Sequence, residues 1–394
     1  MLAQFYPPVV GGEENAVQSL SRELVRRGHE VHVATTGEGP DASESDDEGV
    51  RVHRLPTLLA KTDRLHSAAR RQLPPGPEPE LTRRLHALTR RVRPDVVHAH
   101  NWIVHSYVPV KRRLGVPLVL SAHDFSLVCA TKRFLHHREP CSGPGPAKCL
   151  GCARGHYGGL RGVAVAGLLG VTAPVERRRL DHVLPVSSFL ADELRLDAFG
   201  VPHTVIPNFI PGDLLRAADA APDAPLPDGE VVLFAGDLSR DKGFDVVLRA
   251  APRLRERAQL VAVGREMDVS LGEARAAGIT VLDPVSRPTL LRAFAAATVS
   301  LVPSAWREPF GLVALESMAM GAAVVASATG GLTDMVVDDD TGLLVTPGDA
   351  DGLADATLRL LDDPALRARL GTAARRRVDE RFSATSVLPQ MEDV

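Results

Sequence analysis

The sequence is poor in aromatic side chains and in net charge. Phe, Trp and Tyr make up 4% of its 394 residues, and the formal net charge is −3. Few aromatics argue against a surface on which single-stranded bases could stack, and a small negative charge leaves no electrostatic footprint for nucleic acid. We therefore expect no nucleic-acid partner.

An N-terminal signal and long apolar runs are also lacking. The segment from Met1 to Pro8 is short and uncharged and leads directly into Pro-Pro, unlike a signal peptide. The longest weakly polar run, Val163 to Val175, is predicted to be too short to cross a bilayer and contains Gly and Pro. These absences predict a cytoplasmic protein, and peripheral contact with the inner face of the membrane stays open.

Cysteine is scarce and confined to one short segment. The four cysteines are Cys129, Cys141, Cys149 and Cys152. In a cytoplasmic chain such a group favours metal ligands or reduced thiols over disulfides. The last two are separated by two residues, and four thiolates would suit a structural zinc ion. Two interpretations stay open: this zinc site, with His136, His137 and His156 as further candidate ligands, or thiols that hold down a Gly/Pro-rich loop.

What the chain does have is an alternation of short apolar strands with helices. This order predicts α/β domains with parallel sheets covered on both faces, and the length predicts two of them. We place an N-terminal domain at 1–207, a C-terminal domain at 208–378, and a final segment at 379–394 that crosses back toward the first domain. Only Met1 to Gln4 precedes the first loop, so we expect the first strand to be incomplete.

Two polar stretches interrupt the first domain. The acidic stretch Gly37 to Gly49 and the Pro-rich stretch Leu73 to Glu80 are predicted to be surface loops. Many arginines occupy Lys61 to Arg71 and Arg83 to Arg93. They would suit an amphipathic helix on anionic lipid headgroups, or a solvated helix face balanced by the acidic loop.

The strongest candidate site lies between Trp306 and Gly321. Glu308 directly follows an apolar strand, and Glu316 lies one turn into the helix that comes next. Ligands of open α/β sheets bind at the carboxyl ends of strands, and a helix N-terminus offers free amides and a positive dipole end. A carboxylate there could accept hydrogen bonds from a ribose diol. Two isolated glutamates could equally be surface residues, but the Pro-Phe-Gly-Leu-Val context favours a site.

Three further segments are candidates: two follow strands, and Gly11-Gly12 precedes a helix. Lys242 precedes Gly243 at the start of a helix, where a cation opposes the helix dipole unless it serves an anion such as pyrophosphate, with Arg240 as a second cation. Gly11-Gly12 permits close approach of backbone to a ligand. His123-Asp124 ends a strand in the first domain. Taken alone, each of these could be an ordinary loop.

Together these pieces resemble glycosyltransferase family 4, a large retaining family, over nearly the whole chain. Phe5 to Glu14 resembles the opening of the family. Glu308 and Glu316, with seven residues between them in Glu-Pro-Phe-Gly-Leu-Val-Ala-Leu-Glu, resemble its signature. Gly330-Gly331 and Thr341 to Val345 resemble its later loops. The resemblance implies the GT-B fold, an α/β architecture of two Rossmann-like doubly wound domains that face an interdomain cleft.

The resemblance also implies roles for residues. His123, Glu308 and Lys242 would be catalytic: His123 near the reacting carbon, Glu308 on hydroxyls of the transferred sugar, and Lys242 on the departing pyrophosphate. The remaining donor-binding residues would be Gly12, Arg240, Phe310, Gly311, Leu312 and Glu316, with Glu316 holding the ribose. The donor would be a UDP-, GDP- or other nucleotide sugar, the acceptor is unidentified, and no cofactor is required for catalysis.

The chain departs from the family pattern at two positions. Asp237 stands where the family often has an arginine that pairs with the phosphates, and Asp334 stands where it usually has Glu. Either Arg240 substitutes for the missing cation or donor affinity is weaker. Two alternatives to transfer stay open, a sugar-nucleotide epimerase and a binding protein without catalysis.

Overall fold

The computed structural model describes every residue except 10, 38, 40, 59–72, 138 and 224. By its internal contacts the chain divides into two compact units. Unit 1 comprises Met1–Ile206 together with Val394, and unit 2 comprises Pro207–Asp393. This division lies one residue from the boundary that we expected, and each unit is described by itself below.

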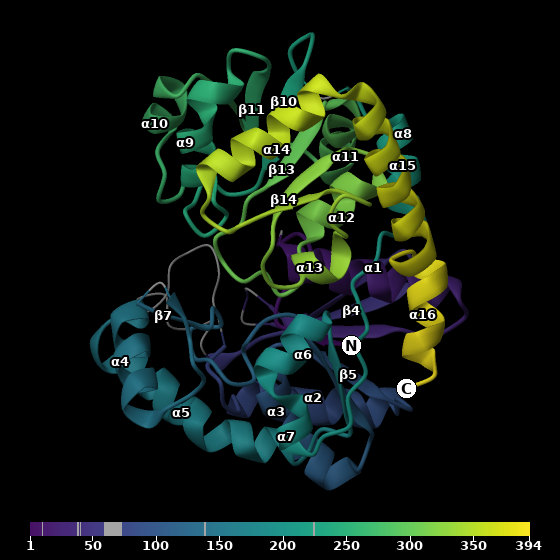
Figure 1. Cartoon of the computed structure of the whole chain (residues 1–394). Helices are drawn as coiled ribbons and strands as arrows, with labels where there is room; N and C mark the ends of the chain where they lie inside the picture. The colour runs from purple at the N-terminus through teal and green to yellow at the C-terminus, as the bar shows by residue number, and fades with distance from the viewer. Residues whose placement is uncertain (10, 38, 40, 59–72, 138, 224) are drawn as a thin grey trace. The chain divides into compact units, whose positions relative to one another are not determined.

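Unit 1 is built on a seven-stranded sheet in the order β3-β4-β2-β1-β5-β6-β9 (Figure 1). The strands are β1 (Leu2–Ala3), β2 (His32–Thr36), β3 (Ser43–Asp47), β4 (Val50–Leu55), β5 (Val97–His100), β6 (Leu118–Ala122) and β9 (His182–Pro185). The helices are α1 (Gly12–Arg26), α2 (Pro79–Val92), α3 (Ile103–Leu114), α4 (Pro146–Tyr157), α5 (Gly159–Arg177), α6 (Ser188–Leu194) and α7 (Leu196–Phe199). A small hairpin pairs β7 (Leu135–His136) with β8 (Glu139–Pro140). All strand pairs of the large sheet are parallel except β3 with β4, so its parallel strands have the doubly wound order.

Unit 2 repeats this plan with six parallel strands in the order β12-β11-β10-β13-β14-β15. The strands are β10 (Val231–Ala235), β11 (Gln259–Val263), β12 (Ile279–Leu282), β13 (Val299–Val302), β14 (Val324–Ser327) and β15 (Leu343–Val345). The helices are α8 (Gly212–Ala220), α9 (Phe244–Leu254), α10 (Leu271–Ala276), α11 (Arg287–Ala296), α12 (Leu312–Ala319), α13 (Leu332–Met335), α14 (Ala350–Asp362), α15 (Pro364–Arg381) and α16 (Ala384–Glu392).

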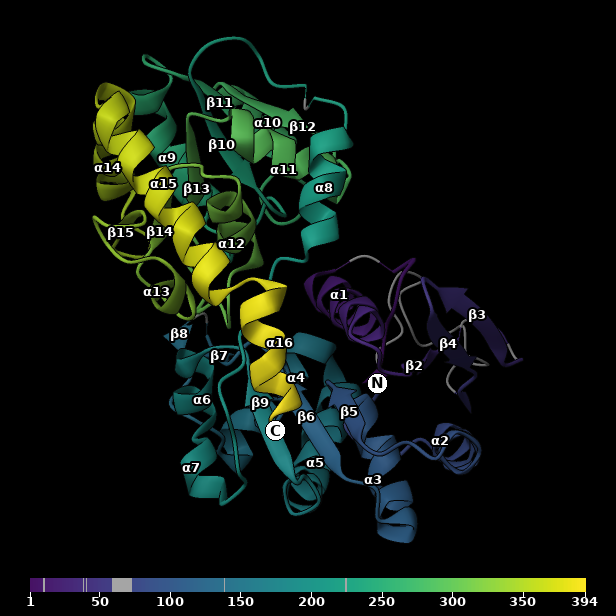
Figure 2. The same cartoon turned by 90° about the vertical axis from the view of Figure 1, so that its right-hand side faces the viewer.

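The alternating side chains of β10 show how this second sheet is covered. Val232 and Phe234 pack with α9 and α14 on one face, whereas Val231 and Leu233 pack with α11 on the other. Figure 2 shows α9 and α14 on one side of β10 and α11 on the other. A strand that is apolar on both faces needs such two-sided cover. The predicted fold class, a two-domain α/β protein with parallel sheets, is confirmed.

The acidic stretch Gly37 to Gly49 is not simply a loop, and that prediction was wrong. Ser43–Asp47 forms the edge strand β3, antiparallel to β4. Ser, Glu and Asp have low strand propensity, but pairing with β4 overrides it, and charged residues on an edge strand discourage pairing with another chain.

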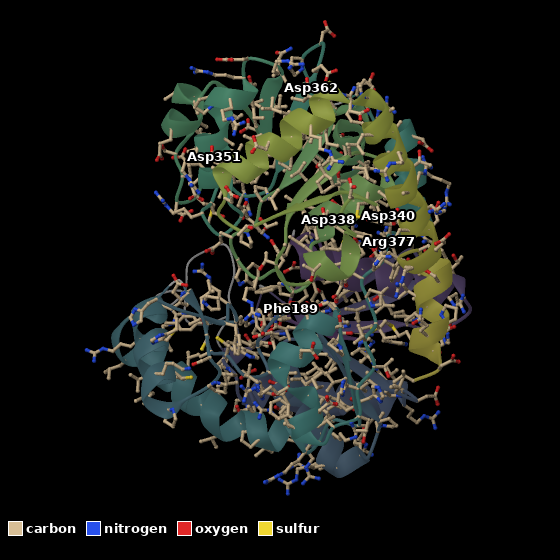
Figure 3. The ribbon with its side chains drawn as sticks, in the orientation of Figure 1. Phe189, Asp338, Asp340, Asp351, Asp362 and Arg377 are labelled. Atoms are coloured by element: carbon tan, nitrogen blue, oxygen red, sulfur yellow. The ribbon has the colours of Figure 1, made fainter. Side chains whose placement is uncertain are left out.

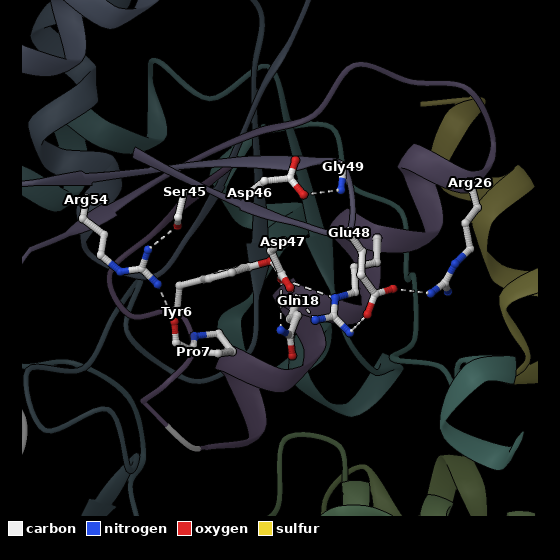
Figure 4. A network of polar contacts seen from close by, with 11 residues as sticks. Tyr6, Pro7, Gln18, Arg26, Ser45, Asp46, Asp47, Glu48, Gly49 and Arg54 are labelled. Atoms are coloured by element: carbon white, nitrogen blue, oxygen red, sulfur yellow. Dashed lines mark hydrogen bonds and ion pairs between the residues drawn. The ribbon is translucent and has the colours of Figure 1, made fainter. Parts of the chain in front are cut away.

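Asp47 anchors this edge strand to the rest of unit 1 (Figure 4). Its carboxylate accepts hydrogen bonds from the Tyr6 hydroxyl at 2.7 Å and the Gln18 amide at 3.0 Å, and it pairs with the Arg22 guanidinium. Burial alone would raise the pKa of Asp47, but the hydrogen bonds from Arg22, Gln18 and Tyr6 hold that pKa below its usual value. The network fixes α1 and the loop after β1 against the sheet.

The Pro-rich stretch and the second Arg-rich stretch contain buried and helical residues. Residues 73–80 were predicted to be a surface loop, and this was wrong at both ends. Leu73 is buried and does not lie at the surface, and Pro79 already belongs to helix α2. Within α2, both Arg83 and Arg84 pair with Glu80. These pairs favour the solvated helix face over a lipid-binding one. The other arginine-rich prediction, at residues 61–71, lies outside the described part of the chain.

The apolar run at Val163 to Val175 lies inside α5, which has 19 residues. The expectation that this run is too short to cross a bilayer was wrong, because the helix also includes Gly159 to Gly162 and Glu176-Arg177. Of the described residues, α5 alone forms a helix long and apolar enough to span a membrane by length and composition, and 22% of that window is buried. One such helix is weak evidence for a membrane span.

A buried pair at the end of α5 predicts a specific pH dependence. Glu176 lies 3.2 Å from the His105 ring, and both side chains are almost fully buried. Burial raises the pKa of Glu176 from 4.5 to about 8, although nearby Arg177 opposes the shift. Burial likewise lowers the pKa of His105 from 6.5 to about 4, with a smaller contribution from Lys132. At neutral pH the pair is therefore uncharged.

These shifts act in opposite directions on stability. Because the pKa of Glu176 is raised in the folded state, the protein loses stability as pH rises from the unfolded pKa of this carboxyl to its folded pKa. His105 has a lowered pKa and adds no further change in stability above its unfolded pKa of 6.5. Glu176→Gln should therefore remove a loss of about 2 kcal/mol between about pH 6.5 and about pH 8. Urea unfolding at both pH values measures it. Glu139→Gln, an exposed change on β8, should retain the loss, and an unchanged slope in Glu176→Gln would contradict a raised pKa.

Candidate active site

The loops after β10 and β13 of unit 2 are tied together. The two strands are neighbours in the sheet, at the point where the strand order reverses, which is where ligands of doubly wound sheets bind. The Asp241 carbonyl accepts hydrogen bonds from the backbone amides of Ala305 and Trp306 at 3.1 and 3.0 Å. Residues far apart in the sequence therefore meet at this edge of the sheet.

Gly243 makes the close contact of the two loops possible. It has a φ of 74°, and a Cβ atom at this position would lie 1.8 Å from the Pro303 carbonyl oxygen. Only glycine tolerates both conditions without moving backbone. Gly243 is therefore needed for the Lys242 loop to pack against the end of β13.

Lys242 and Glu308 form an ion pair in this position. The Lys242 Nζ lies 2.5 Å from Glu308 Oε1, and the Ser304 hydroxyl donates to the same oxygen at 2.9 Å. The ammonium also lies 5.5 Å from the centre of the Trp306 ring. Glu308 is buried, whereas the Lys242 side chain is 36% exposed. The structure therefore brings together two of the three predicted catalytic residues and leaves the cation accessible.

A second glycine pair supports Glu308 from behind. The Gly331 amide donates to the Glu308 carbonyl at 2.7 Å, and a Cβ atom on Gly330 would lie 2.2 Å from that same oxygen. The helix that follows, α13, is held by Arg377 of α15, whose guanidinium donates to the carbonyl oxygens of Asp334 and Met335, both at 2.8 Å. Figure 3 labels Arg377 close to Asp340 in this region. The position of Glu308 thus depends on residues well beyond it in the sequence.

The start of α12 supplies backbone amides to the same region. Gly311 precedes the helix with a φ of 105°, and Leu312 is its first residue. The first amides of a helix have no partner within it and attract anions. Phe310 was predicted to bind the donor, but its side chain is buried edge-on against Phe382 with ring centres 6.1 Å apart. Its side chain therefore packs the loop rather than presenting a binding surface.

Glu316 of α12 is held by a residue that we did not predict. Arg287, the first residue of α11, places its Nε 2.6 Å from Glu316 Oε1, and Glu316 is 6% exposed. A buried carboxylate needs such a partner. Arg287 follows shortly after β12, and this strand-end position was the available sequence signal.

Asp237 has a partner in the next loop of the sheet. The Arg265 guanidinium binds both oxygens of Asp237, at 3.0 and 3.2 Å, and thereby neutralises the charge that would repel phosphates. The two loops approach so closely that a Cβ on Gly264 would lie 1.8 Å from the Gly236 carbonyl oxygen. Arg240 is exposed. The Ser270 amide and hydroxyl, which donate to the Glu273 carboxylate, lower the pKa of Glu273, and the Arg240 charge adds a smaller effect in the same direction. Arg265, and not Arg240, is therefore the cation that pairs with Asp237.

Unit 1 has its own polar cluster at the corresponding position, beside β1 and β5. The Asn101 amide donates to Glu13 at 2.9 Å and to Asp124 at 3.3 Å, and Lys132 donates to the Asn101 oxygen at 2.5 Å. Lys132 also lies 4.2 Å from the centre of the Trp102 ring. Burial, helped by the Asp124 charge, raises the pKa of Glu13 to about 7. No pattern in the sequence predicted Lys132, whereas Glu13 directly follows the predicted Gly12 at the start of α1.

His123 adjoins this cluster at the end of β6. Its Nε2 lies 2.9 Å from the Nδ1 of His100, and the two rings stack. Burial lowers the pKa of His123 to about 4, against the effect of Asp124. The imidazole is therefore uncharged at neutral pH and can exchange hydrogen bonds with a hydroxyl group.

The four cysteines lie around α4 and the small hairpin, all partly buried and all free. Their thiols contact nearby polar groups: Cys129 the Thr131 hydroxyl at 3.3 Å, and Cys149 the Gly145 amide at 3.3 Å. Burial, with contributions from the other three thiols, raises the pKa of Cys152. Among the described residues no three His, Cys, Asp or Glu side chains are placed to hold one metal ion. The structural zinc site therefore gains no support from this geometry and stays a prediction.

Family models match both halves of the chain. Residues 10–213 match the model for Glycosyltransferase Family 4, and residues 219–377 match that for Glycosyl transferases group 1. The D-inositol 3-phosphate glycosyltransferase of Arthrobacter sp. strain FB24 is 34% identical over 92% of this chain and 85% of its own length. The glycogen synthase of Mycobacterium tuberculosis is 31% identical over 98% of this chain and 91% of its own.

Solved structures agree on the fold. Sucrose-phosphate synthase from Thermosynechococcus elongatus superposes with a TM-score of 0.73 at 24% identity, and covers 98% of this chain and 92% of its own. The catalytic domain of starch synthase IV from Arabidopsis thaliana, bound to ADP and acarbose, has a TM-score of 0.68 at 18% identity over 100% of this chain and 97% of its own. The chain therefore belongs to glycosyltransferase family 4 and is a glycosyltransferase of the GT-B fold.

Proposed function

We propose that this glycosyltransferase takes its sugar from a nucleoside-diphosphate sugar, bound by unit 2, and passes it with retention of configuration to an acceptor hydroxyl. The observation that carries the proposal is the Lys242–Glu308 pair at the switch point of the sheet, beside the N-terminus of α12. Relatives and structural neighbours whose names include glycogen synthase and an ADP-bound starch synthase support a nucleotide-sugar donor.

The diphosphate is assigned to Lys242 and the first amides of α12. When the bond between the sugar and the diphosphate breaks, negative charge grows on the leaving phosphate, and a fixed cation and backbone amides stabilise that charge. Lys242 is bound by Glu308 before the donor arrives, so the ammonium is already oriented. Arg265 keeps Asp237 from opposing the phosphates.

The ribose is assigned to Glu316. A carboxylate can accept two hydrogen bonds from a vicinal diol. The Nε of Arg287 contacts one carboxylate oxygen, Oε1, at 2.6 Å, and a carboxylate has acceptor capacity for further donors. Glu308 is assigned to hydroxyls of the transferred sugar, where its carboxylate, fixed by Lys242 and Ser304, can distinguish the arrangement of hydroxyl groups.

The acceptor is assigned to the polar cluster of unit 1. Glu13, Asn101 and the uncharged His123 offer hydrogen-bonding groups suited to a polyhydroxylated molecule. In the transfer step the bond between the anomeric carbon and the diphosphate oxygen breaks as the acceptor oxygen bonds to that carbon from the same face. The acceptor proton leaves with the diphosphate. Because attack from the face that the leaving group vacates retains the configuration in one step, no enzyme nucleophile is required. Exclusion of water would limit hydrolysis of the donor.

A thermal-shift screen against UDP, GDP, ADP and dTDP tests the donor assignment. One of the four should raise the melting temperature, because a ligand that binds only the native state stabilises it by about 2.7 kcal/mol at a hundredfold excess over Kd. The corresponding nucleotide sugars are then incubated with candidate acceptors. Free nucleotide with a glycosylated product supports transfer, a new sugar isomer indicates an epimerase, and binding without either product indicates a non-catalytic protein. Absence of any shift would contradict the assignment to unit 2.

A further inference from the structure

One face of α5 is apolar and open to solvent. Leu160 is 87% exposed, Val171 is 70% exposed and Val175 is 45% exposed. With the exposed Ala164 and Gly167 they recur at intervals of three or four residues, so they form one stripe along the helix. Exposed apolar side chains are normal when scattered, but a contiguous stripe indicates a binding surface.

The opposite face fixes α5 to unit 1. A Cβ atom on Gly162 would lie 2.1 Å from the Ala153 carbonyl of α4, and Leu169 lies in a small core with Ala153. Near the C-terminal end, Glu176 is buried and the Arg177 guanidinium donates to the Leu127 carbonyl at 2.9 Å. These contacts hold α5 along the surface of unit 1, so it cannot cross a bilayer by itself without breaking them. Figure 1 shows α4 and α5 as a pair of helices at the outer edge of this unit.

The charge around this stripe is strongly one-sided. Residues 141–180 contain six cationic side chains and one acidic side chain, in a chain whose overall charge is −3. The six are Lys148, Arg154, Arg161, Arg177, Arg178 and Arg179. The single acid, Glu176, is buried and does not face solvent. Arg154 lies exposed on α4, and Arg178 and Arg179 lie exposed just past α5.

An apolar groove opens between the same two helices. Its volume is about 390 Å³, and Val128, Leu150, Ala166 and Leu169 are among the residues that line it. Of the described residues that line the groove, Arg177 alone is charged. Leu150 is itself 38% exposed, so apolar surface extends from α5 onto α4.

We infer that α4 and α5 form a docking surface for a lipid bilayer with anionic headgroups, on which the stripe enters the interface and the cations contact the headgroups. Apolar side chains that face outward between basic residues, on a helix held parallel to the protein surface, are the features of interfacial binding. A second copy of the chain would also cover the stripe. In a symmetric dimer, however, the same patch meets itself and would bring the cations together. This inference does not depend on the donor assignment.

Vesicle co-sedimentation tests it with the full chain. Vesicles of phosphatidylcholine mixed with phosphatidylglycerol should bind the protein at low salt, whereas pure phosphatidylcholine vesicles should bind it at least about tenfold more weakly. High salt should weaken binding to the anionic vesicles, because screening shortens the reach of the charges. Equal binding to both vesicles, or none to either, would overturn the inference.

Variants distinguish the contribution of the apolar stripe to vesicle binding from that of the cationic side chains. Leu160→Gln with Val171→Gln removes apolar surface without adding charge and should weaken vesicle binding by about tenfold or more. The matched controls Val96→Gln in unit 1 and Met267→Gln in unit 2, at positions 51% and 61% exposed, should bind as the parent does. Arg178→Gln with Arg179→Gln should lower binding and its salt dependence. Thermal melting checks that each variant folds.

The same variants test whether a second copy of the chain, rather than a bilayer, covers the stripe. Light scattering after gel filtration should give the same mass for the parent and the Leu160/Val171 double variant. If the double variant bound vesicles like the parent, the stripe would not be the docking surface. If it instead changed the oligomeric state and left vesicle binding intact, the face would be an interface between copies, and the inference would be wrong.

Discussion

Lys242→Ala should lower kcat for glycosyl transfer by about 10²–10³-fold, the usual effect of removing one fixed group that stabilises developing charge. The ammonium lies 2.5 Å from Glu308 and is partly accessible to a ligand. The change removes the cation assigned to the departing diphosphate and also leaves Glu308 buried without its ion pair. The same variant should give no thermal shift with the nucleoside diphosphate that stabilises the parent.

Two comparisons make this result specific. Lys242→Arg keeps the positive charge in a different shape and should recover part of kcat, because a guanidinium can still meet a phosphate but not in the same geometry. Arg253→Ala removes an exposed cation from the neighbouring helix α9, where it pairs with Asp355, and should leave kcat unchanged. If Lys242→Ala kept the kcat and the thermal shift of the parent, the assignment of the diphosphate to this site would be wrong.

Much of this site was predictable because its residues follow strands. Lys242 and Glu308 both lie in loops that follow apolar strands, and the carboxyl ends of parallel strands meet at one edge of a sheet. The helix expected after Glu308 is present as α12, and Glu316 lies within it. These predictions depend on local pattern and strand order, which the sequence carries.

Partners that depend on loop packing were not predictable. Arg265 and Asp237 belong to loops after different strands, and they meet because Gly264 and Gly236 allow backbone to touch backbone. A single sequence contains no signal for such an approach. The edge strand β3 was missed for a related reason, since its acidic residues have low strand propensity and only pairing with β4 makes them a strand.

Phe310 shows how a sequence pattern can mislead about the orientation of one side chain within a candidate site. The Glu-Pro-Phe-Gly segment does lie at the site, but the aromatic ring turns inward against Phe382 of a distant helix end. Which side chains of a loop face the ligand depends on the loop's backbone, and Gly330 and Gly331 shape that backbone by lying against Glu308 and Pro309. The residues that support a site are therefore harder to identify than those within it.

Glu316→Gln should weaken binding of the nucleoside diphosphate by about 100-fold, since two hydrogen bonds to a charged group at about 1.5 kcal/mol each amount to about 3 kcal/mol. Glutamine has the same shape but lacks the charge, and its amide would point a donor at either the ribose or Arg287. Glu316 is almost fully buried, so solvent would not compensate. Calorimetric titration with the diphosphate found in the thermal-shift screen measures the change.

Binding of the 2′-deoxy form of the same nucleotide tests whether Glu316 contacts the ribose or only maintains the structure of the site. The parent should bind the ribonucleotide more tightly than the deoxynucleotide, because the deoxy form leaves one carboxylate oxygen of Glu316 without its hydroxyl donor. Glu316→Gln should lose most of this discrimination, whereas Glu256→Gln, an exposed change in the same unit, should keep it. If Glu316→Gln bound both nucleotides weakly but discriminated as well as the parent, Glu316 would act on the site only by positioning Arg287 and not by holding the ribose.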